Sequence, residues 1–345
     1  AALTAISKEA YDMAKSFESA MAEVSTIANV SEKEMRGLEQ RLFDIYKRLG
    51  TEPPDKLAKG LYEIIGAGYD AAEALDVLEI ASKAATAGIT TTEVAADGLT
   101  TILNAFQLQT EDAQEVADVM FATVDRGKIS FEELSSQIAQ VAPIAAASNI
   151  SFEEIGAAIS TLTKQGVPAG QAMTQIRSAI VSTTEVMGDG VFETLSLQDA
   201  FNEMYKAADG SQTKLKEMAG RVEAVNGILS IAGPNMEGAV EDLNAMSDAA
   251  GSVDRSFSKV TGTNANQWSI FTNRIKASTQ GIGESLLRFS NAVVGLMNDA
   301  IGSTEDLTDE VAKQASEYRN LIASLYDSNV EFDKKLEILT QLKNE

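Results

Sequence analysis

Residues 129–134 of the chain read ISFEEL, and residues 150–155 repeat the pattern as ISFEEI. In both hexapeptides a serine precedes a glutamate by three residues, and an apolar residue lies on either side of the pair. This is a capping box with a hydrophobic staple, in which the serine side chain and the glutamate side chain each accept a hydrogen bond from the other residue's backbone amide. Each hexapeptide therefore predicts a helix start, with Ser130 and Ser151 as the N-cap residues.

Two looser versions of the same box occur earlier in the chain. Residues 30–35 read VSEKEM and residues 89–94 read ITTTEV, so a hydroxyl side chain again precedes a glutamate by three residues. They predict helix starts with Ser31 and Thr90 as the N-cap residues. Four starts of this kind indicate a chain of short, well-delimited helices.

The stretch DRGKISFEEL at residues 125–134 also resembles the second half of a calcium-binding EF-hand loop, with Glu133 at the last ligand position. The first three side-chain ligand positions would then be occupied by Ala122, Val124 and Arg126. Two apolar side chains and a cation do not coordinate Ca²⁺. The stretch is therefore interpreted as a helix start and not as a calcium site.

Apolar residues recur at helical spacing after the two hexapeptides. Counted from the phenylalanine of each hexapeptide, they fall at positions 0, +3, +7 and +10. This spacing places them on one helix face and predicts a packed core. The first stripe consists of Phe131, Leu134, Ile138 and Val141, and the second of Phe152, Ile155, Ile159 and Leu162.

Glycine and proline interrupt the helical pattern, and alternating strand patterns are nearly absent. Clear breaks occur at Pro53-Pro54, at Pro143 and at the GVPAG stretch of residues 166–170. We therefore predict an all-α protein with about a dozen helices of roughly 10–18 residues each, which form a helical domain over residues 1–260. A longer amphipathic helix and two C-terminal helices are expected to follow.

From about residue 264 the helical pattern runs uninterrupted to residue 300. A straight helix over this run would be about 55 Å long at roughly 1.5 Å per residue. Residues 261–302 are therefore predicted to form a connector or oligomerisation helix. The candidate self-association residues on its apolar stripe are Trp268, Phe271, Ile275, Leu286 and Phe289. Trp268 is interpreted first as a core or helix–helix anchor and second as a residue that faces a partner.

Residues 303–345 are expected to form a C-terminal helical segment that leads into further sequence of a parent protein. The opening AALTAISKEA has no initiator Met and no leader pattern, which indicates a piece of a longer chain. No window reaches about 18 uncharged apolar residues, so no membrane span is expected.

The charge balance limits the kinds of partner that the chain is expected to bind. The chain has 28 basic and 51 acidic residues and a net charge of −23. Direct nucleic-acid binding is not expected, because phosphates require Lys and Arg, and an anionic membrane surface would repel the chain. Two interpretations of the acidity remain open: solubility of an alanine-rich helical protein, or avoidance of DNA by a protein that shares a space with it.

The composition also argues against catalysis. The chain has no Cys and no His, which removes thiolate chemistry and the commonest general base and metal ligand. Carboxylate pairs occur at Glu111-Asp112, Glu132-Glu133 and Glu153-Glu154, and each falls in a predicted first helical turn, where anions complement the helix dipole. No catalytic residue, cofactor site or metal site is predicted.

The order of several segments resembles one family over most of residues 10–300. Residues 16–30 (SFESAMAEVSTIANV) resemble its opening helix, and residues 66–82 (GAGYDAAEALDVLEIAS) its Gly-Tyr segment. Residues 84–120 carry an LNAF-like spacing followed by Ala-Asp-Val. Residues 131–182 carry Val-Ala-Pro and, later, a Gly-x-x-Ala-Gly-x-Ala-like pattern. A Gln-Trp pair begins at residue 267. The chain is similar in these segments to phage tail tape measure proteins of the TP901 type.

The resemblance implies a structural protein of a phage or phage-like tail. Such a protein lies in the tube lumen, sets tail length during assembly in the bacterial host cytoplasm, and is ejected into the host envelope to assist genome delivery. The implied partners are further copies in a homo-oligomer, the tail tube protein, baseplate or tail-tip proteins, and tail assembly chaperones. The resembling residues are packing and capping residues, so no catalytic residue is implied.

Two other hypotheses remain from the residues alone. One is a secreted or surface helical scaffold that binds a host protein. The other is an enzyme that uses carboxylates alone, which only the number of acidic residues favours.

Overall fold

The computed structural model describes residues 2–263 together with Asn266 and Ile270, with side chains from Asp12 onward. Within this part the chain is all-α, with sixteen α-helices, three short 3₁₀ helices and no strand. The predicted fold class is thereby confirmed.

The helices are joined by short connections. In chain order they are α1 (Ala2–Ile27), α2 (Glu32–Leu49), α3 (Pro54–Gly66), α4 (Ala71–Gly88), α5 (Thr92–Phe106), α6 (Ala113–Arg126), α7 (Phe131–Gln137), α8 (Ala142–Ala147), α9 (Phe152–Lys164), α10 (Ala169–Met187), α11 (Val191–Thr194), α12 (Leu197–Ala207), α13 (Gln212–Ala219), α14 (Val222–Ile231), α15 (Met236–Ser247) and α16 (Ser252–Thr261). The 3₁₀ helices are η1 (Thr110–Asp112), η2 (Ile138–Gln140) and η3 (Gly233–Asn235).

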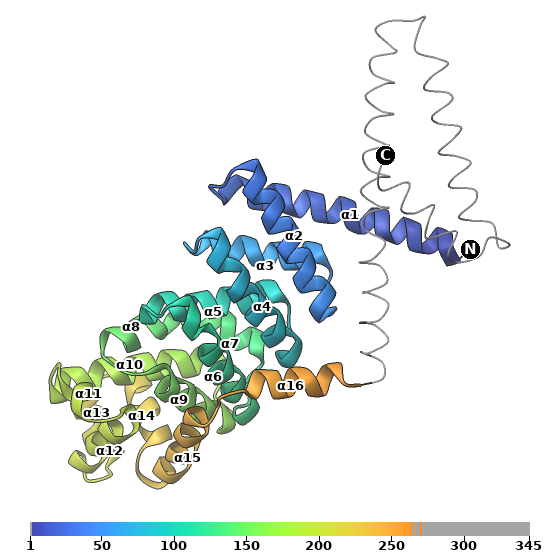
Figure 1. The fold of residues 1–345 in the computed structure, drawn as a ribbon. Coiled ribbons are helices and arrows are strands. Elements are labelled where there is room, and N and C mark those ends of the chain that lie inside the picture. The colour runs from blue at the N-terminus through green and yellow to red at the C-terminus, as the bar shows by residue number, and fades with distance from the viewer. Residues whose placement is uncertain (1, 264–265, 267–269, 271–345) are drawn as a thin grey trace, which may run out of the picture.

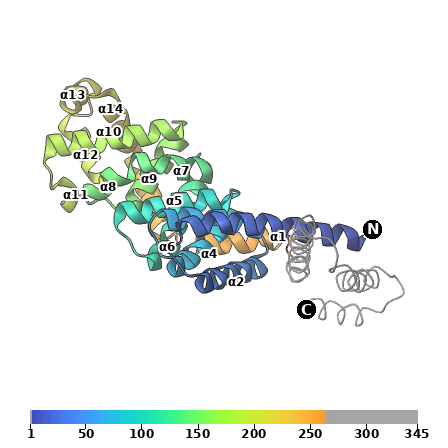
Figure 2. The same cartoon turned by 90° about the horizontal axis from the view of Figure 1, so that it is seen from above.

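The helices are arranged from one end of the array to the other roughly in chain order. Helices α1 to α3 lie at one end, and α10 to α14 lie at the opposite end (Figure 1). The last two described helices break this order, because α15 packs on α9 and α6 while α16 returns to α4 and α6. Seen from above, the N-terminal half of α1 extends beyond the other described helices (Figure 2).

The described part contains more helices than the dozen or so expected, because some predicted runs are divided. The first apolar stripe runs through α7 and then η2, and α8 begins as a separate helix with Pro143 in its first turn. Proline lacks the amide hydrogen that a continuous helix would need there. Helix α11 is a single turn of four residues.

One cluster of buried apolar side chains extends from Phe17 to Val253. Both predicted stripes belong to it, and every one of their eight side chains is at most 5% exposed. Small residues allow close packing: a Cβ on Gly227 of α14 would lie 2.6 Å from the backbone oxygen of Gln175 in α10. These two helices therefore pack with their backbones nearly in contact.

The predicted segments 261–302 and 303–345 lie almost wholly outside the described residues, as do Trp268, Phe271, Ile275, Leu286 and Phe289. Among the helices that the structure describes, none combines the length and apolar character needed to cross a membrane.

Candidate functional site

Ser31, Ser130 and Ser151 are the N-cap residues of α2, α7 and α9, and each forms a complete capping box. The serine Oγ accepts a hydrogen bond from the glutamate amide at 3.1–3.4 Å. The serine amide donates to the glutamate carboxylate at 2.8–2.9 Å. The backbone bond, followed by the serine hydroxyl bond, holds the pKa of Glu34 and Glu133 below its usual range.

The fourth predicted cap is displaced by one residue. Thr91, and not Thr90, caps α5, and its Oγ1 accepts from the Val94 amide at 3.3 Å. Thr90 belongs instead to the end of α4, because its amide donates to the Ala85 carbonyl at 2.9 Å. The preceding Ile89 ends α4 in the left-handed conformation with φ 55° and is 90% exposed.

A distant residue completes this helix start. The carboxylate of Glu52, in the α2–α3 connection, accepts a hydrogen bond from the Thr92 amide at 2.9 Å and another from the Thr92 hydroxyl. The sequence pattern predicted a different bond, from the Thr90 amide to Glu93, but the Thr90 amide donates to the Ala85 carbonyl. The cap is therefore a tertiary contact between two helix connections.

Glu154 also acts beyond its own capping box. Its second carboxylate oxygen accepts from the Leu197 amide at 2.7 Å, and its carbonyl accepts from the buried side chain of Gln198 at 3.2 Å. Both partners lie in the first turn of α12. The start of α9 thus holds the start of α12.

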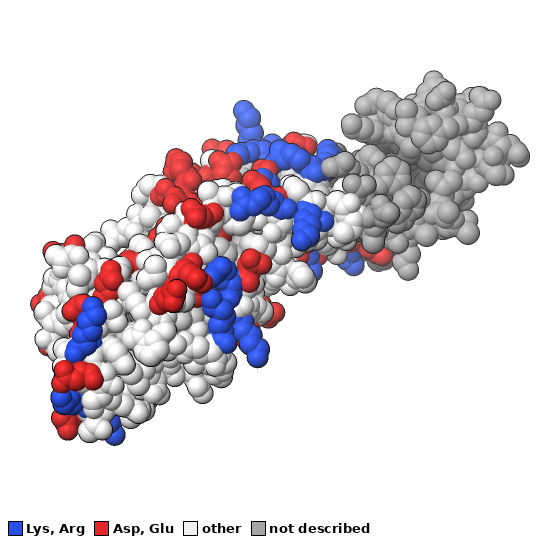
Figure 3. All heavy atoms as spheres, turned by 90° about the horizontal axis from the view of Figure 1, so that it is seen from below, with Lys and Arg blue, Asp and Glu red and all other residues white. Residues whose placement is uncertain are grey.

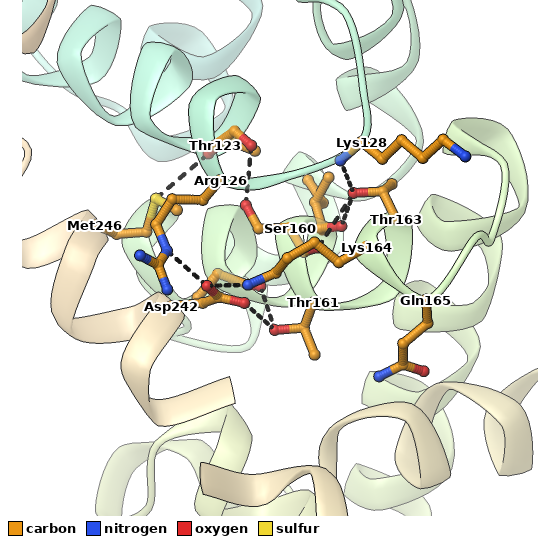
Figure 4. Close-up of polar contacts among 12 residues, drawn as sticks. Thr123, Arg126, Lys128, Ser160, Thr161, Thr163, Lys164, Gln165, Asp242 and Met246 are labelled. Atoms are coloured by element: carbon orange, nitrogen blue, oxygen red, sulfur yellow. Dashed lines mark hydrogen bonds and ion pairs between the residues drawn. The ribbon is translucent and has the colours of Figure 1, made fainter. Parts of the chain in front are cut away.

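The most concentrated polar group of the described chain surrounds Asp242 of α15, whose side chain is fully buried (Figure 4). Its carboxylate accepts from Arg126 Nε at 2.7 Å, from Lys164 Nζ at 2.5 Å and from the Thr161 hydroxyl at 2.8 Å. Arg126 ends α6, and the other two donors lie at the end of α9. We call these four residues the Asp242 junction. Without the two cations, the buried Asp242 charge would lose the partners that compensate its burial.

Further polar contacts join α6 to α9 and to α15 beside the Asp242 junction (Figure 4). The Ser160 hydroxyl donates to the Thr123 carbonyl at 3.0 Å, and the Thr123 hydroxyl lies 3.5 Å from the Met246 sulfur. The Lys128 amide donates to Thr163 Oγ1 at 3.2 Å. These bonds align the ends of the two helices that supply the partners of Asp242.

A second buried carboxylate, that of Asp118 in α6, holds the start of α16. Its two oxygens accept from the amides of Gly251 and Val253, each at 2.8 Å. These amides are among the donors that an α-helix leaves unpaired at its N-terminus. On the neighbouring side, Lys83 of α4 pairs with Asp254 of α16 at 3.1 Å. Asp118 therefore caps a helix that begins more than 130 residues later in the chain.

The two buried carboxylates hold neighbouring helices together. The Asp242 and Asp118 carboxylates accept hydrogen bonds from neighbouring helices, and their burial keeps them from solvent. Within residues 12–263 no group of three or more Asp or Glu side chains is arranged to hold a metal ion. The three predicted carboxylate pairs lie in first turns of α7, α9 and η1.

The surface is mixed in charge on the face shown in Figure 3, where acidic and basic side chains are interspersed among uncharged areas. The acidity is uneven along the chain, since residues 84–125 contain no Lys or Arg. A groove of about 520 Å³ opens where the α2–α3 and α4–α5 connections meet the end of α16, and Glu52, Ile89 and Ile270 contribute to its lining.

Asp118 and Asp242 were not predicted from the sequence. A usable signal was present, because Asp242 lies between Ala239 and Met246 at helical spacing, and Asp118 is flanked by apolar residues on both sides. An acidic residue at an otherwise apolar helix position indicates a buried carboxylate that requires partners. Which residues supply those partners cannot be read from the spacing.

Comparison with known proteins gives the class of this helical array. Residues 46–191, from the end of α2 to the start of α11, match the family described as phage-related minor tail protein. Together with the relatives described next, this match supports a structural protein of the phage tail.

Two curated relatives indicate which kind of phage tail protein the chain resembles. The probable tape measure protein of Clostridium phage phiCD119 is 27% identical to this chain, over 72% of the chain and 29% of the relative. The tape measure protein of Pneumococcus phage Dp-1 is 26% identical, over 48% of the chain and 14% of the relative. The resemblance to phage tail tape measure proteins is thereby confirmed.

The chain spans less than a third of the length of these curated relatives. No solved structure matches it.

Proposed function

We propose that the chain is a segment of a tape measure protein, which lies in the lumen of the tail tube, sets tail length during assembly and leaves ahead of the DNA to assist its passage across the host envelope. The observation that carries this proposal is the similarity to two proteins named as tape measure proteins, over 72% and 48% of the chain. The protein acts as a structural component and not as an enzyme.

The two parts of the chain suit different tasks. A ruler works by its extended length, and a single helix contributes about 1.5 Å per residue. The described helices instead fold back on one another around one core, so they add little length for their number of residues. The array therefore serves as an anchor near one end of the tube, and the run of residues 264–300 contributes to the measured length.

The partners follow from this placement. They are further copies of the chain, the tail tube protein, baseplate or tail-tip proteins, and the chaperones that keep the protein competent for assembly. The net charge of −23 supports a protein that shares a lumen with DNA without adhering to it, because like charges repel.

Tail length tests the proposal. An in-frame deletion of residues 264–300 from the parent gene is expected to shorten the tail by up to about 55 Å, at roughly 1.5 Å per helical residue. Electron microscopy of purified tails measures the change. In the matched control, an unrelated helical segment of equal length replaces these residues and is expected to restore the original tail length.

Unchanged length in the deletion strain would place this run outside the measured span. Normal infectious particles that lack the parent protein altogether would overturn the tape measure function itself and favour the secreted scaffold.

A further inference from the structure

The end of the described chain folds back across the body. After η3, helix α15 packs on α9 and α6, and α16 continues to α4 and α6 (Figure 1). The turn itself is anchored, because the Gly233 amide donates to the Asn202 side chain of α12 at 3.1 Å. The chain therefore leaves the body at a fixed point and then covers helices that lie much earlier in the sequence.

Apolar packing contributes little to the attachment of α16. Val253 is its one fully buried residue, and Phe257 is packed against the core only in part. By contrast, ten of the thirteen residues of α9 are buried. Because hydrophobic stabilisation scales with buried apolar area, α16 is held far more weakly by packing than the helices beneath it.

Polar anchors supply the rest of the attachment. Asp242 fixes α15 to the ends of α6 and α9, and Asp118 fixes the first amides of α16 to α6. The Lys83–Asp254 pair holds α16 to α4. The bonds of the two buried carboxylates are strong while water is excluded and weaken once it enters, so an attachment built mainly from them gives way over a short displacement.

We propose that α15 and α16, residues 236–261, form a clasp that a pull on the chain beyond residue 261 opens as one unit while the remaining helices stay folded. The pull acts first on the C-terminal end of α16, where packing is sparse. Opening then stops at η3, because α14 is joined to α10 through the close Gly227 contact.

The open clasp leaves no charge stranded in the interior. Asp242 departs with α15 into water. Its partners Arg126 and Lys164 are already 35% and 41% exposed in the closed form, so they complete their hydration where they are. Asp118 becomes accessible when α16 lifts away.

The use of the clasp in a particle rests on the proposed function. In a tail it would let the chain beyond residue 261 be drawn out while the array remains folded and anchored. The opening step is a property of the isolated protein, so it can be refuted while the tail-length result stands, and the reverse also holds.

Force spectroscopy on the full chain tests the proposal. The chain has no native Cys, so Thr174→Cys on the exposed face of α10 and Thr263→Cys beyond α16 provide two unique attachment points. The first unfolding event in an optical trap is expected to release no more than about 90 Å of chain, at roughly 3.5 Å per extended residue from Met236 to Thr261. A single event that unfolds the whole loaded region would overturn the clasp.

Matched variants identify the anchors. Asp242→Asn is expected to raise the opening rate at constant force by at least about tenfold, because it removes the charge that both cations require. Glu241→Gln makes the same charge change on the exposed neighbour and is expected to leave the rate within about twofold. Equal rates in these two variants would contradict the proposal.

The same comparison applies to α16, with Asp118→Asn as the test and the exposed Glu115→Gln as its control. If a buried variant does not fold, Asp254→Asn serves instead, since this side chain is 55% exposed and its loss leaves the core intact. A rise of about two- to fivefold in the opening rate is expected for that variant. No rise in any of the three variants would refute a polar clasp.

Discussion

At the scale of single residues, the carboxylates of α3 and α5 carry a measurable electrostatic cost. Burial, followed by the nearby charges of Asp97 and Glu93, raises the pKa of Glu63, and burial also raises the pKa of Asp97. A carboxyl whose folded pKa lies above its unfolded value binds its proton more tightly in the folded state. Its ionisation therefore reduces stability at neutral pH, and this cost disappears as the pH falls through the folded pKa.

Substitution of Asp97 tests this repulsion. Asp97→Asn is expected to lower the pKa of Glu63 toward its ordinary value, because one of the neighbouring negative charges is removed. NMR titration of the Glu63 carboxyl measures the shift. The stability of the variant should exceed that of the original chain at pH 7, with a gain that shrinks in acid.

The control for this experiment is Glu241→Gln, an exposed change of the same charge on α15. It is expected to leave the Glu63 titration where it was. An unchanged Glu63 pKa in Asp97→Asn would show that burial and Glu93, and not Asp97, raise the value.

At the scale of elements, helix starts and close helix contacts define the array. Local capping boxes at Ser31, Ser130 and Ser151 begin three helices with bonds made within four residues. Glu52 and Asp118 perform the same task for α5 and α16 from distant positions. An amide at a helix start requires an acceptor, and the acceptor can come from any segment that packs there.

The contact between α10 and α14 gives a sharp prediction at this scale. Gly227→Ala is expected to lower the free energy of unfolding by about 1–3 kcal/mol, because the added Cβ would lie 2.6 Å from a backbone oxygen of α10. Gly238→Ala in α15 meets no atom within 4 Å and is expected to raise stability by roughly 0.5–1 kcal/mol, as alanine is the better helix former. Urea denaturation of both variants measures the difference, and equal effects would argue against a close α10–α14 contact.

At the scale of the whole molecule, the question is how copies of the chain meet. The stripe of Trp268, Phe271, Ile275, Leu286 and Phe289 remains the predicted self-association surface, and these five residues lie outside the described part of the chain. Trp268→Asp combined with Phe271→Asp is expected to dissociate an oligomer, because both substitutions bring charge into an apolar interface. Light scattering measures the mass.

The matched control is Ser269→Asp combined with Asn273→Asp, which adds the same charge off the stripe and is expected to leave the mass unchanged. An unaltered mass in the Trp268 and Phe271 variant would remove these residues from the interface.

Much of the fold was predictable because its signals are local. The all-α class follows from helical periodicity, and both apolar stripes predicted from spacing are buried. The prediction of Thr90 as a cap was wrong because its amide donates to the Ala85 carbonyl at the end of α4. Glu52 from another connection binds the Thr92 amide of the same helix start, and no local pattern indicated that contact. The division of the helices near Pro143 was indicated only as a break and not as a second helix.

The sequence by itself determined the helical class, three of the four predicted helix starts and the resemblance to tape measure proteins, because these depend on bonds and spacings within a few residues. Only the tertiary structure decided where the buried carboxylates find their partners. Arg126 and Asp242 are separated by 116 residues, and Val253 and Asp118 by 135. No local pattern encodes such pairs, since they form only after the intervening helices have packed and brought the ends of α6 and α9 beneath the returning chain.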